Sequence, residues 1–347
     1  MPRTPGKQRK RSKVFLIVIL ILLAPVGWLA YRTFLNNVSG GFREGYVYIR
    51  TGSSFDDLLR QLEEQHVLNN MTSFRLLAQQ VGLDKKVRPG KYRIGSYEGN
   101  YAIVRKLRNG QQEPVKLVIN KFRTRDDLIA FVSQRLETDT AALRQLLLDR
   151  DFLQQYGLNE YTAMSLVLPD TYEYWWNTDA EGLLKKLAAY YEKYWTDERK
   201  ARAAALQLQP AEVVTLASIV EEETNKPDEK PAVASVYLNR LRKGMPLQAD
   251  PTVKFAWNDF TIKRILNEHT QISSPYNTYR HTGLPPGPIC TPSKRSIEAV
   301  LDPAKTGYLY FCAREDFSGY HVFAETYSQH LVNARRYHEA LNARNIR

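Results

Sequence analysis

The residues best suited to acid–base chemistry are three consecutive glutamates, Glu221, Glu222 and Glu223, which directly follow an apolar stretch. From Pro210 to Val220, apolar side chains recur at three- and four-residue spacings, which predicts a helix with one face on a core. If the helix continues through the glutamates, Glu221 and Glu223 lie on its apolar side and Glu222 on its wetter side. We therefore expect two carboxyl groups in an apolar environment.

A carboxyl group that loses hydration has a raised pKa, so it can hold a proton near neutrality and deliver it as a general acid. The alternative is that the three charges close the helix and lie in water, as charge runs usually do. Helical periodicity does not distinguish Glu221 from Glu223 as the proton donor.

The glutamate helix lies within a mainly helical region that begins near Thr124. Capping residues before apolar residues at helical spacing predict its helices, with Thr124 and Thr138 standing where the caps of the first two belong. Two strand-like runs joined through Gly319 predict a β-hairpin. Two rigid loops with polar and aromatic residues, residues 274–279 and 283–288, are of the kind that commonly carries binding groups. We expect helices at residues 125–136, 139–149, 180–194, 197–208, 210–224, 232–242, 296–301 and 327–342, and the hairpin at 308–313 and 320–323.

Residues 168–172 predict a turn fixed by Pro169, and Asp250 stands where the cap of a following helix is expected. An aromatic cluster, Tyr174 to Trp176, comes after the turn. Such a cluster either fills a core or stacks on sugar rings, whose faces are apolar.

The region before residue 120 predicts a small α+β module. It opens with a strand at 46–50, a turn of glycine and serine residues, and an amphipathic helix at 55–65, and it continues with helices at 73–81 and 101–108 and strands at 89–94 and 115–119. This order of elements resembles a LysM-type module, a small fold associated with glycans that contain N-acetylglucosamine. Any compact α+β module could carry the same order of elements.

The net charge of +12 is unevenly distributed, because half of it lies in the first thirteen residues. The remainder of the chain lacks a concentrated basic stripe, which argues against a nucleic-acid partner. An uncharged apolar segment, Val14 to Tyr31, follows and is about as long as a helix that crosses a bilayer. We expect a single transmembrane helix with the basic tail in the cytoplasm and the body outside it. A cleaved signal peptide is the alternative.

The two cysteines, Cys290 and Cys312, either pair or remain separate thiols packed as small apolar side chains. Neither has neighbours at metal-ligand spacing, and no metal site is expected.

Six motifs stand in a fixed order along the body of the chain: LPDTY (168–172), ASIVEEET (217–224), VASVYLNRL (233–241), LQADPTV (247–253), PYNTY (275–279) and TGLPPGPI (282–289). Together they resemble the endolytic murein transglycosylases, the YceG-like proteins. The resemblance implies a membrane-anchored bacterial enzyme that cuts nascent peptidoglycan strands internally and leaves 1,6-anhydro-N-acetylmuramic acid ends. It also implies that Glu221 is the catalytic acid and Glu223 a supporting residue.

Such a reaction needs one proton donor and a held sugar hydroxyl, so we expect neither a metal nor an organic cofactor. Five polar or aromatic residues of these motifs are expected to line the glycan cleft, although Asp250 could serve only as a helix cap and Asn277 only in a turn. The five are Asn239, Gln248, Asp250, Tyr276 and Asn277.

The overall expectation is an α+β protein of the inner membrane. Its parts are a basic tail (1–13), a transmembrane anchor (14–34), a linker (35–45), a LysM-like module (46–120) and a YceG-like catalytic domain (121–347). Expected partners are peptidoglycan strands, the membrane and peptidoglycan synthases. The competing hypothesis is a membrane-tethered, non-catalytic peptidoglycan-binding scaffold.

Overall fold

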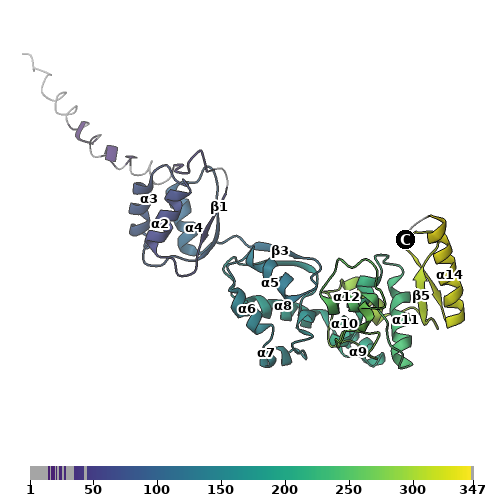
Figure 1. The fold of residues 1–347 in the computed structure, drawn as a ribbon. Coiled ribbons are helices and arrows are strands. Elements are labelled where there is room, and N and C mark those ends of the chain that lie inside the picture. Colours follow the sequence, from purple (N-terminus) through teal and green to yellow (C-terminus); the bar gives the residue numbers. More distant parts are fainter. Residues whose placement is uncertain are drawn as a thin grey trace, which may run out of the picture. The chain divides into compact units, whose positions relative to one another are not determined.

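The computed structural model describes residues 35–42 and 45–344, together with separate helical positions between 15 and 28 (Figure 1). The predicted basic tail and much of the predicted anchor lie outside the described residues. Within the described part of the chain, no single helix is both long and apolar enough to cross a membrane. Asp197–Ala205 and Pro210–Glu223 have that length and composition only together, as a pair bent by 75°. The transmembrane anchor therefore stays a prediction.

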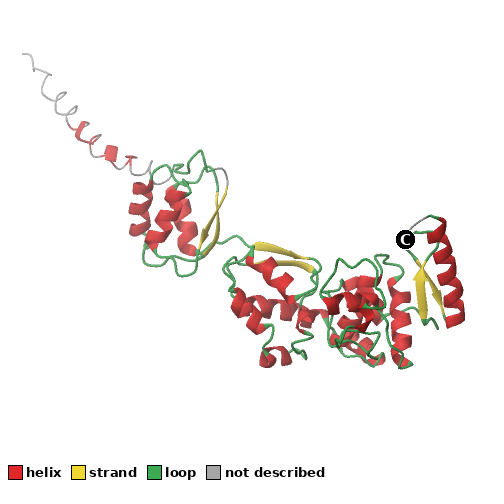
Figure 2. Cartoon of the chain, viewed as in Figure 1, coloured by secondary structure: helices red, strands yellow, loops and turns green. Residues whose placement is uncertain are grey.

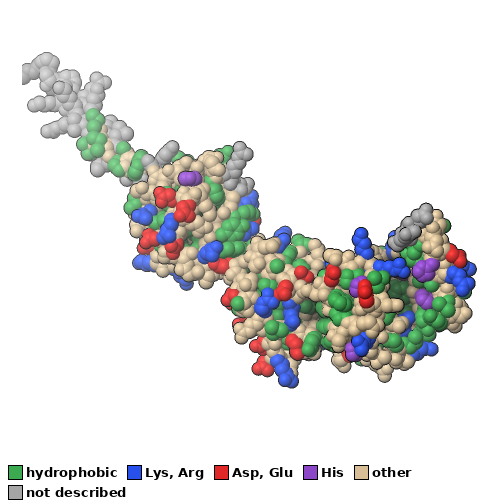
Figure 3. All heavy atoms as spheres, viewed as in Figure 1, with side chains coloured by type: hydrophobic (Ala, Val, Ile, Leu, Met, Phe, Trp, Pro, Cys, Tyr) green, Lys and Arg blue, Asp and Glu red, His purple; other side chains and the backbone are tan. Residues whose placement is uncertain are grey.

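The chain divides into two compact units. The first runs to Val115 and includes Glu173–Thr178, and the second comprises Lys116–Tyr172 and Asp179–Arg347. Both combine helices with small two-stranded sheets, and helices predominate (Figure 2). On the face drawn in Figure 3, basic and acidic side chains are intermixed over both units.

The first unit packs three helices against one antiparallel strand pair, in which Val47 lies opposite Tyr92. Alternation along the first strand buries Val47 and Ile49 and leaves Tyr46 and Tyr48 partly exposed. Ser54 and Asn70 cap the first two helices through their side chains. The elements are β1 Gly45–Ile49, α2 Phe55–Glu64, α3 Met71–Gln80, β2 Gly90–Ile94 and α4 Asn100–Asn109.

Part of the predicted linker belongs to this unit. Val38 is only 2% exposed, and it forms an antiparallel bridge with Leu68. The buried side chain of Asn37 donates to Asn100 Oδ1 at 2.6 Å. Glycine and serine near this segment suggested a loose connection, but long-range packing, which local composition does not report, holds it in place.

The second unit contains the remaining elements, except that Val115 and residues 173 and 174 are grouped with the first unit. The helices and the hairpin that were predicted for it lie close to their predicted bounds. The remaining elements are β3 Val115–Ile119, α5 Arg125–Ser133, α6 Thr140–Leu146, α7 Arg150–Gln154, η1 Ala163–Leu166, β4 Asp170–Tyr174, α8 Ala180–Tyr194, α9 Asp197–Ala205, α10 Pro210–Glu223, α11 Lys230–Arg242, α12 Asp250–Trp257, η2 His269–Gln271, α13 Lys294–Leu301, β5 Tyr310–Ala313, β6 His321–Ala324 and α14 Tyr327–Ala343.

Helix α10 is the central helix of this unit and contacts α11, α12 and α13. Every residue from Val213 to Val220 is buried, so the helix is enclosed on all sides and lacks the wetter face that the sequence predicted. The two hydroxyl groups on that face are satisfied within the helix: Thr215 donates to Ala211 O at 2.9 Å and Ser218 to Thr215 O at 2.7 Å. The two ends of α10 are less enclosed: Glu212 is exposed near its start, and the three glutamates are partly exposed at its end.

Three local predictions were wrong. Residues 170–174 form strand β4 rather than ending in a turn, because β3 pairs with them from far away in the sequence. Asp139, not Thr138, caps α6. Asp250 is the first residue of α12 rather than its cap, and its side chain makes no capping bond.

The C-terminal layer consists of the antiparallel strands β5 and β6 with α14 packed on them. No residue of α14 is fully buried. Cys290 is buried, Cys312 is partly exposed, and both are free thiols, which favours the second of the two alternatives for the cysteines.

Candidate active site

The three glutamates end α10 and point in different directions, because successive residues of a helix are about 100° apart. Each carboxylate meets a different set of neighbours. These sets, rather than the shared apolar helix, determine what each glutamate can do.

Glu221 is held in a dense set of hydrogen bonds. Lys230 Nζ lies 2.7 Å from Glu221 Oε2, and Ser293 Oγ donates to the same oxygen at 2.7 Å. Ser296 Oγ and the Ser293 backbone N–H also donate to it. Burial pushes the pKa of Glu221 upward, but the bonds from Lys230, Ser296 and Ser293 outweigh it, and the pKa lies below its ordinary value. These bonds favour the ionised form of Glu221, and its predicted role as the catalytic acid stays a prediction.

Glu222 is also paired. Lys121 and Arg123 approach its two carboxylate oxygens at 2.6 and 3.0 Å. Burial raises the pKa of Glu222, but the two cations more than compensate, so its pKa lies below the ordinary value. This carboxylate is ionised and joins the end of α10 to the segment before α5.

Glu223 differs from both neighbours because no cation forms an ion pair with it among the described residues. Tyr237 Oη donates to Glu223 Oε1 at 2.7 Å. Burial raises the pKa of Glu223 to about 7, assisted by the negative charge of Asp250 and opposed by the Tyr237 hydrogen bond and by Lys254. A carboxyl group with this pKa is protonated in about half of the molecules at neutral pH, which suits a general acid.

A cavity of about 270 Å³ adjoins Glu223. Gln248 and Asp250 line it and are exposed, so the cavity opens to solvent. Tyr279 Oη donates to Asp250 Oδ1 at 2.6 Å, which fixes that carboxylate within the cavity. The full lining is Glu223, Tyr237, Arg240, Leu247, Gln248, Asp250, Tyr279, Phe311 and His330.

The profile of the YceG-like family matches residues 47–336 of the chain. This chain belongs to the YceG-like family. The resemblance inferred from the six motifs is thereby confirmed, and the matched region includes all of them.

Relatives of this YceG-like protein have names that describe an activity. It is 39% identical over 162 residues to the endolytic murein transglycosylase of Bacillus subtilis, an alignment that covers 47% of this chain and 43% of the relative. It is 27% identical over 343 residues to the endolytic murein transglycosylase of Streptococcus pneumoniae, covering 88% of this chain and 61% of the relative. The chain thus spans about half of the length of these relatives.

A solved structure shows the same fold. The crystal structure of a yceG-like protein from Listeria monocytogenes matches with a TM-score of 0.57 and 27% identity. The match covers 84% of this chain and 98% of the Listeria chain.

Only some of the residues predicted for the site of this YceG-like protein lie in the Glu223 cavity. Asn239 donates to Thr306 O at 2.9 Å and Tyr308 O at 3.0 Å, and it lines a separate cavity of about 770 Å³. Tyr276 packs on Phe255, with ring centroids 4.7 Å apart, in a third cavity. Gln248 and Asp250 are the two predicted polar residues that join Glu223.

Asn277 is completely buried and has a structural role. Its Nδ2 donates to Thr270 O at 2.8 Å and Ile272 O at 2.9 Å, and its Oδ1 accepts the Tyr279 N–H at 3.1 Å. The turn that it stabilises places Tyr279 beside Asp250. Of the two interpretations of Asn277, a residue of the glycan cleft or one that serves only in a turn, this favours the turn.

Sequence reasoning missed six lining residues: Tyr237, Arg240, Leu247, Tyr279, Phe311 and His330. The first four stand inside motifs that were recognised, so motif membership was an available signal. Phe311 and His330 come from the C-terminal hairpin and α14, where no pattern in the sequence indicated a site.

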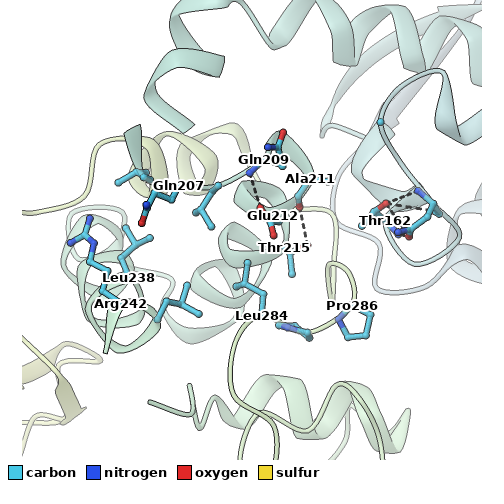
Figure 4. Close-up of a pocket in the computed structure, with 16 residues that line it drawn as sticks. Thr162, Gln207, Gln209, Ala211, Glu212, Thr215, Leu238, Arg242, Leu284 and Pro286 are labelled. Carbon is cyan, nitrogen blue, oxygen red and sulfur yellow. Dashed lines mark hydrogen bonds between the residues drawn. The ribbon is translucent and has the colours of Figure 1, made fainter. Parts of the chain in front are cut away.

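A fourth cavity, of about 640 Å³, lies at the opposite end of α10 (Figure 4). Its one acidic residue is Glu212, whose carboxylate accepts the Gln209 backbone N–H at 2.7 Å. That carboxylate caps the helix, so this cavity presents no proton donor comparable to Glu223.

Proposed function

We propose that this YceG-like protein is an endolytic murein transglycosylase. It cleaves the β-1,4 bond between N-acetylmuramic acid and N-acetylglucosamine within nascent glycan strands and leaves 1,6-anhydro ends. The names of the Bacillus and Streptococcus relatives support this reaction. The observation that carries it is a single carboxyl group, that of Glu223, with a pKa of about 7 beside an open cavity lined with polar groups.

In the proposed mechanism Glu223 acts first as an acid and then as a base. Its proton moves to the glycosidic oxygen as the bond between that oxygen and C1 of the muramic acid breaks. The resulting carboxylate takes the proton of the muramic acid 6-hydroxyl as O6 bonds to C1. No water is consumed, and the glutamate returns to its starting state. The attack is intramolecular, so the attacking oxygen has a high effective concentration.

The neighbours of Glu223 support these two roles. Tyr237 fixes the orientation of the carboxyl group through its 2.7 Å hydrogen bond. Asp250, held by Tyr279, places a negative charge in the same cavity, where it would stabilise positive charge that develops at C1. Gln248 offers an amide to sugar hydroxyl or N-acetyl groups.

The family resemblance implied that Glu221 is the catalytic acid, but we propose a structural role for it. It accepts bonds from Lys230 of α11 and from residues at the start of α13, so it joins three helices at the base of the site. A carboxylate stabilised in this way is a poor proton donor at neutral pH. The catalytic role of Glu221 remains a prediction that the following experiment tests.

Glu223→Gln and Glu221→Gln are the deciding pair of variants. Each keeps the shape of the side chain and removes its ability to cycle a proton. With uncrosslinked glycan strands as substrate, mass spectrometry of strand ends should show that Glu223→Gln lowers anhydro-end release by about 10²- to 10⁴-fold. Glu221→Gln should retain most of the activity per folded molecule, with folding checked by circular dichroism.

The opposite ranking of these two variants would make Glu221 the acid. Strand binding without release of anhydro ends by the unmodified protein would support the non-catalytic scaffold instead.

We further propose that residues 14–34 anchor the protein in the inner membrane, with its body outside the cytoplasm and the first unit acting as a LysM-like glycan-binding module. The basic tail and the uncharged segment support the anchor. Apolar side chains at described positions of this segment are exposed, including Phe15 at 67% and Trp28 at 59%. Peptidoglycan synthases are the partners that would supply nascent strands at that surface.

A further inference from the structure

His330 reaches the Glu223 cavity from α14, at the far end of the sequence. Its ring stacks on Tyr310, with centroids 5.4 Å apart and planes 23° apart. Its Nδ1 atom is buried and has no hydrogen-bond partner among the described residues. A buried polar atom without a partner destabilises a fold, so an imidazole is a poor choice where packing is the only requirement.

The protonation state of this ring limits the contacts it can make. Burial and the nearby positive charge of Arg240 lower the pKa of His330 below its ordinary value. The ring is therefore neutral at neutral pH, with one N–H donor and one acceptor nitrogen. Sugar hydroxyls both donate and accept, so either tautomer of a neutral imidazole can bond to one.

We infer that His330 is a substrate-positioning residue that hydrogen-bonds a hydroxyl or N-acetyl group of the glycan in the Glu223 cavity. A half turn about Cβ–Cγ keeps the ring in its plane, so it preserves the stacking on Tyr310 while it moves Nδ1 to the opposite side of the ring. The contact would supply the hydrogen bond that Nδ1 lacks.

The same wall of the cavity contains Phe311 of β5. Its ring meets Tyr237 edge-on, with centroids 5.9 Å apart, and Tyr237 in turn bonds to Glu223. The C-terminal layer therefore adjoins the carboxyl group itself. The inference assigns this layer a part in holding the glycan, and it rests on the proposed function for the class of ligand.

Three substitutions test the contact in the full chain, each combined with Glu223→Gln so that bound strands are not cut. His330→Phe keeps an aromatic ring on Tyr310 and removes both nitrogens. His330→Gln restores a donor and an acceptor. His338→Ala is the matched control, because His338 is an exposed histidine on the same helix.

The measurement is calorimetric binding of soluble, uncrosslinked glycan strands. We expect His330→Phe to weaken binding by about fivefold to tenfold, the effect of one lost hydrogen bond. His330→Gln should recover most of the loss, and His338→Ala should bind like its parent. In the cleavage-competent background, His330→Phe should raise KM more than it lowers kcat.

Equal dissociation constants for His330→Phe and its parent would overturn the inference, as would an equal loss in His338→Ala. If His330→Phe fails to fold, His330→Leu decides in its place, because it also removes both nitrogens: a loss of binding of about fivefold or more supports the contact, and unchanged binding contradicts it. Failure of the proposed function looks different: strands would bind in a His330-dependent way, yet the unmodified protein would release no anhydro ends.

Discussion

Removal of the Tyr237 hydroxyl should shift the pH dependence of cleavage upward. Tyr237 is 2% exposed and donates to Glu223 Oε1 at 2.7 Å. This bond stabilises the charged carboxylate and so lowers the pKa of Glu223, which burial has raised to about 7. Tyr237→Phe keeps the ring and removes only the donor.

The size of the shift follows from the strength of the bond. A hydrogen bond to a charged group contributes about 1.5 to 3 kcal/mol, and one pKa unit corresponds to about 1.36 kcal/mol. Complete loss of the bond should therefore move the alkaline limb of kcat/KM up by about one to two pH units. The maximal rate should fall, because the carboxyl group is held less firmly.

The assay is the release of anhydro ends from uncrosslinked strands across about pH 5 to 9, a range that brackets the pKa of Glu223. In the unmodified protein kcat/KM should fall tenfold per pH unit above the pKa of about 7. Tyr279→Phe is the matched control, since Tyr279 donates to Asp250 rather than to Glu223. The alkaline limb of kcat/KM in Tyr279→Phe should lie near that of the unmodified protein.

An alkaline limb that stays in place, or moves to lower pH, in Tyr237→Phe would refute the reasoning. The group that titrates would then not be the carboxyl bonded to Tyr237. If the limb instead vanished in Glu221→Gln, the acid would be Glu221, and the low pKa found for it in the folded protein would not describe the enzyme with bound substrate.

Three further predictions concern stability. Lys230→Met should lower the free energy of unfolding, measured by urea titration, by about 3 to 5 kcal/mol, because it leaves a Glu221 side chain that is only 18% exposed without its cation. The pKa of Glu221 is lower in the folded protein than in an ordinary carboxyl group, so its ionised form stabilises the fold. This stability is present above the ordinary carboxyl pKa and is lost as pH falls through the pKa of the folded protein. Glu221→Gln should therefore lose less stability in acid than the unmodified protein. An equal acid slope in the two proteins would contradict this. Gly287→Ala should lower the melting temperature, because the new Cβ would lie 2.0 Å from Tyr161 O, and an unchanged melting temperature would show that this loop can move aside.

Much of this architecture is encoded locally. The apolar spacing from Pro210 to Val220 predicted α10, and Ser54 and Thr124 marked the starts of two helices whose caps the structure confirms. Six short motifs were enough to indicate the family. These features depend on residues close together in the chain, where period, capping and turn chemistry act directly.

Pairings between distant residues were not predictable in this way. Residues 170–174 become a strand because β3 lies beside them, and Val38 is buried because Leu68 meets it. His330 joins the site through the packing of the C-terminal layer. None of these partners lies within a window over which local sequence patterns act.

The three glutamates show this division most clearly. Their position at the end of a buried helix was readable from the sequence, and so was the prospect of a carboxyl group with a raised pKa. Which of them has it depends on what α11, α12 and α13 bring to each: Lys230 beside Glu221, and Tyr237 and Asp250 near Glu223. Desolvation and hydrogen bonds depend on groups in direct contact, so only the tertiary arrangement could decide.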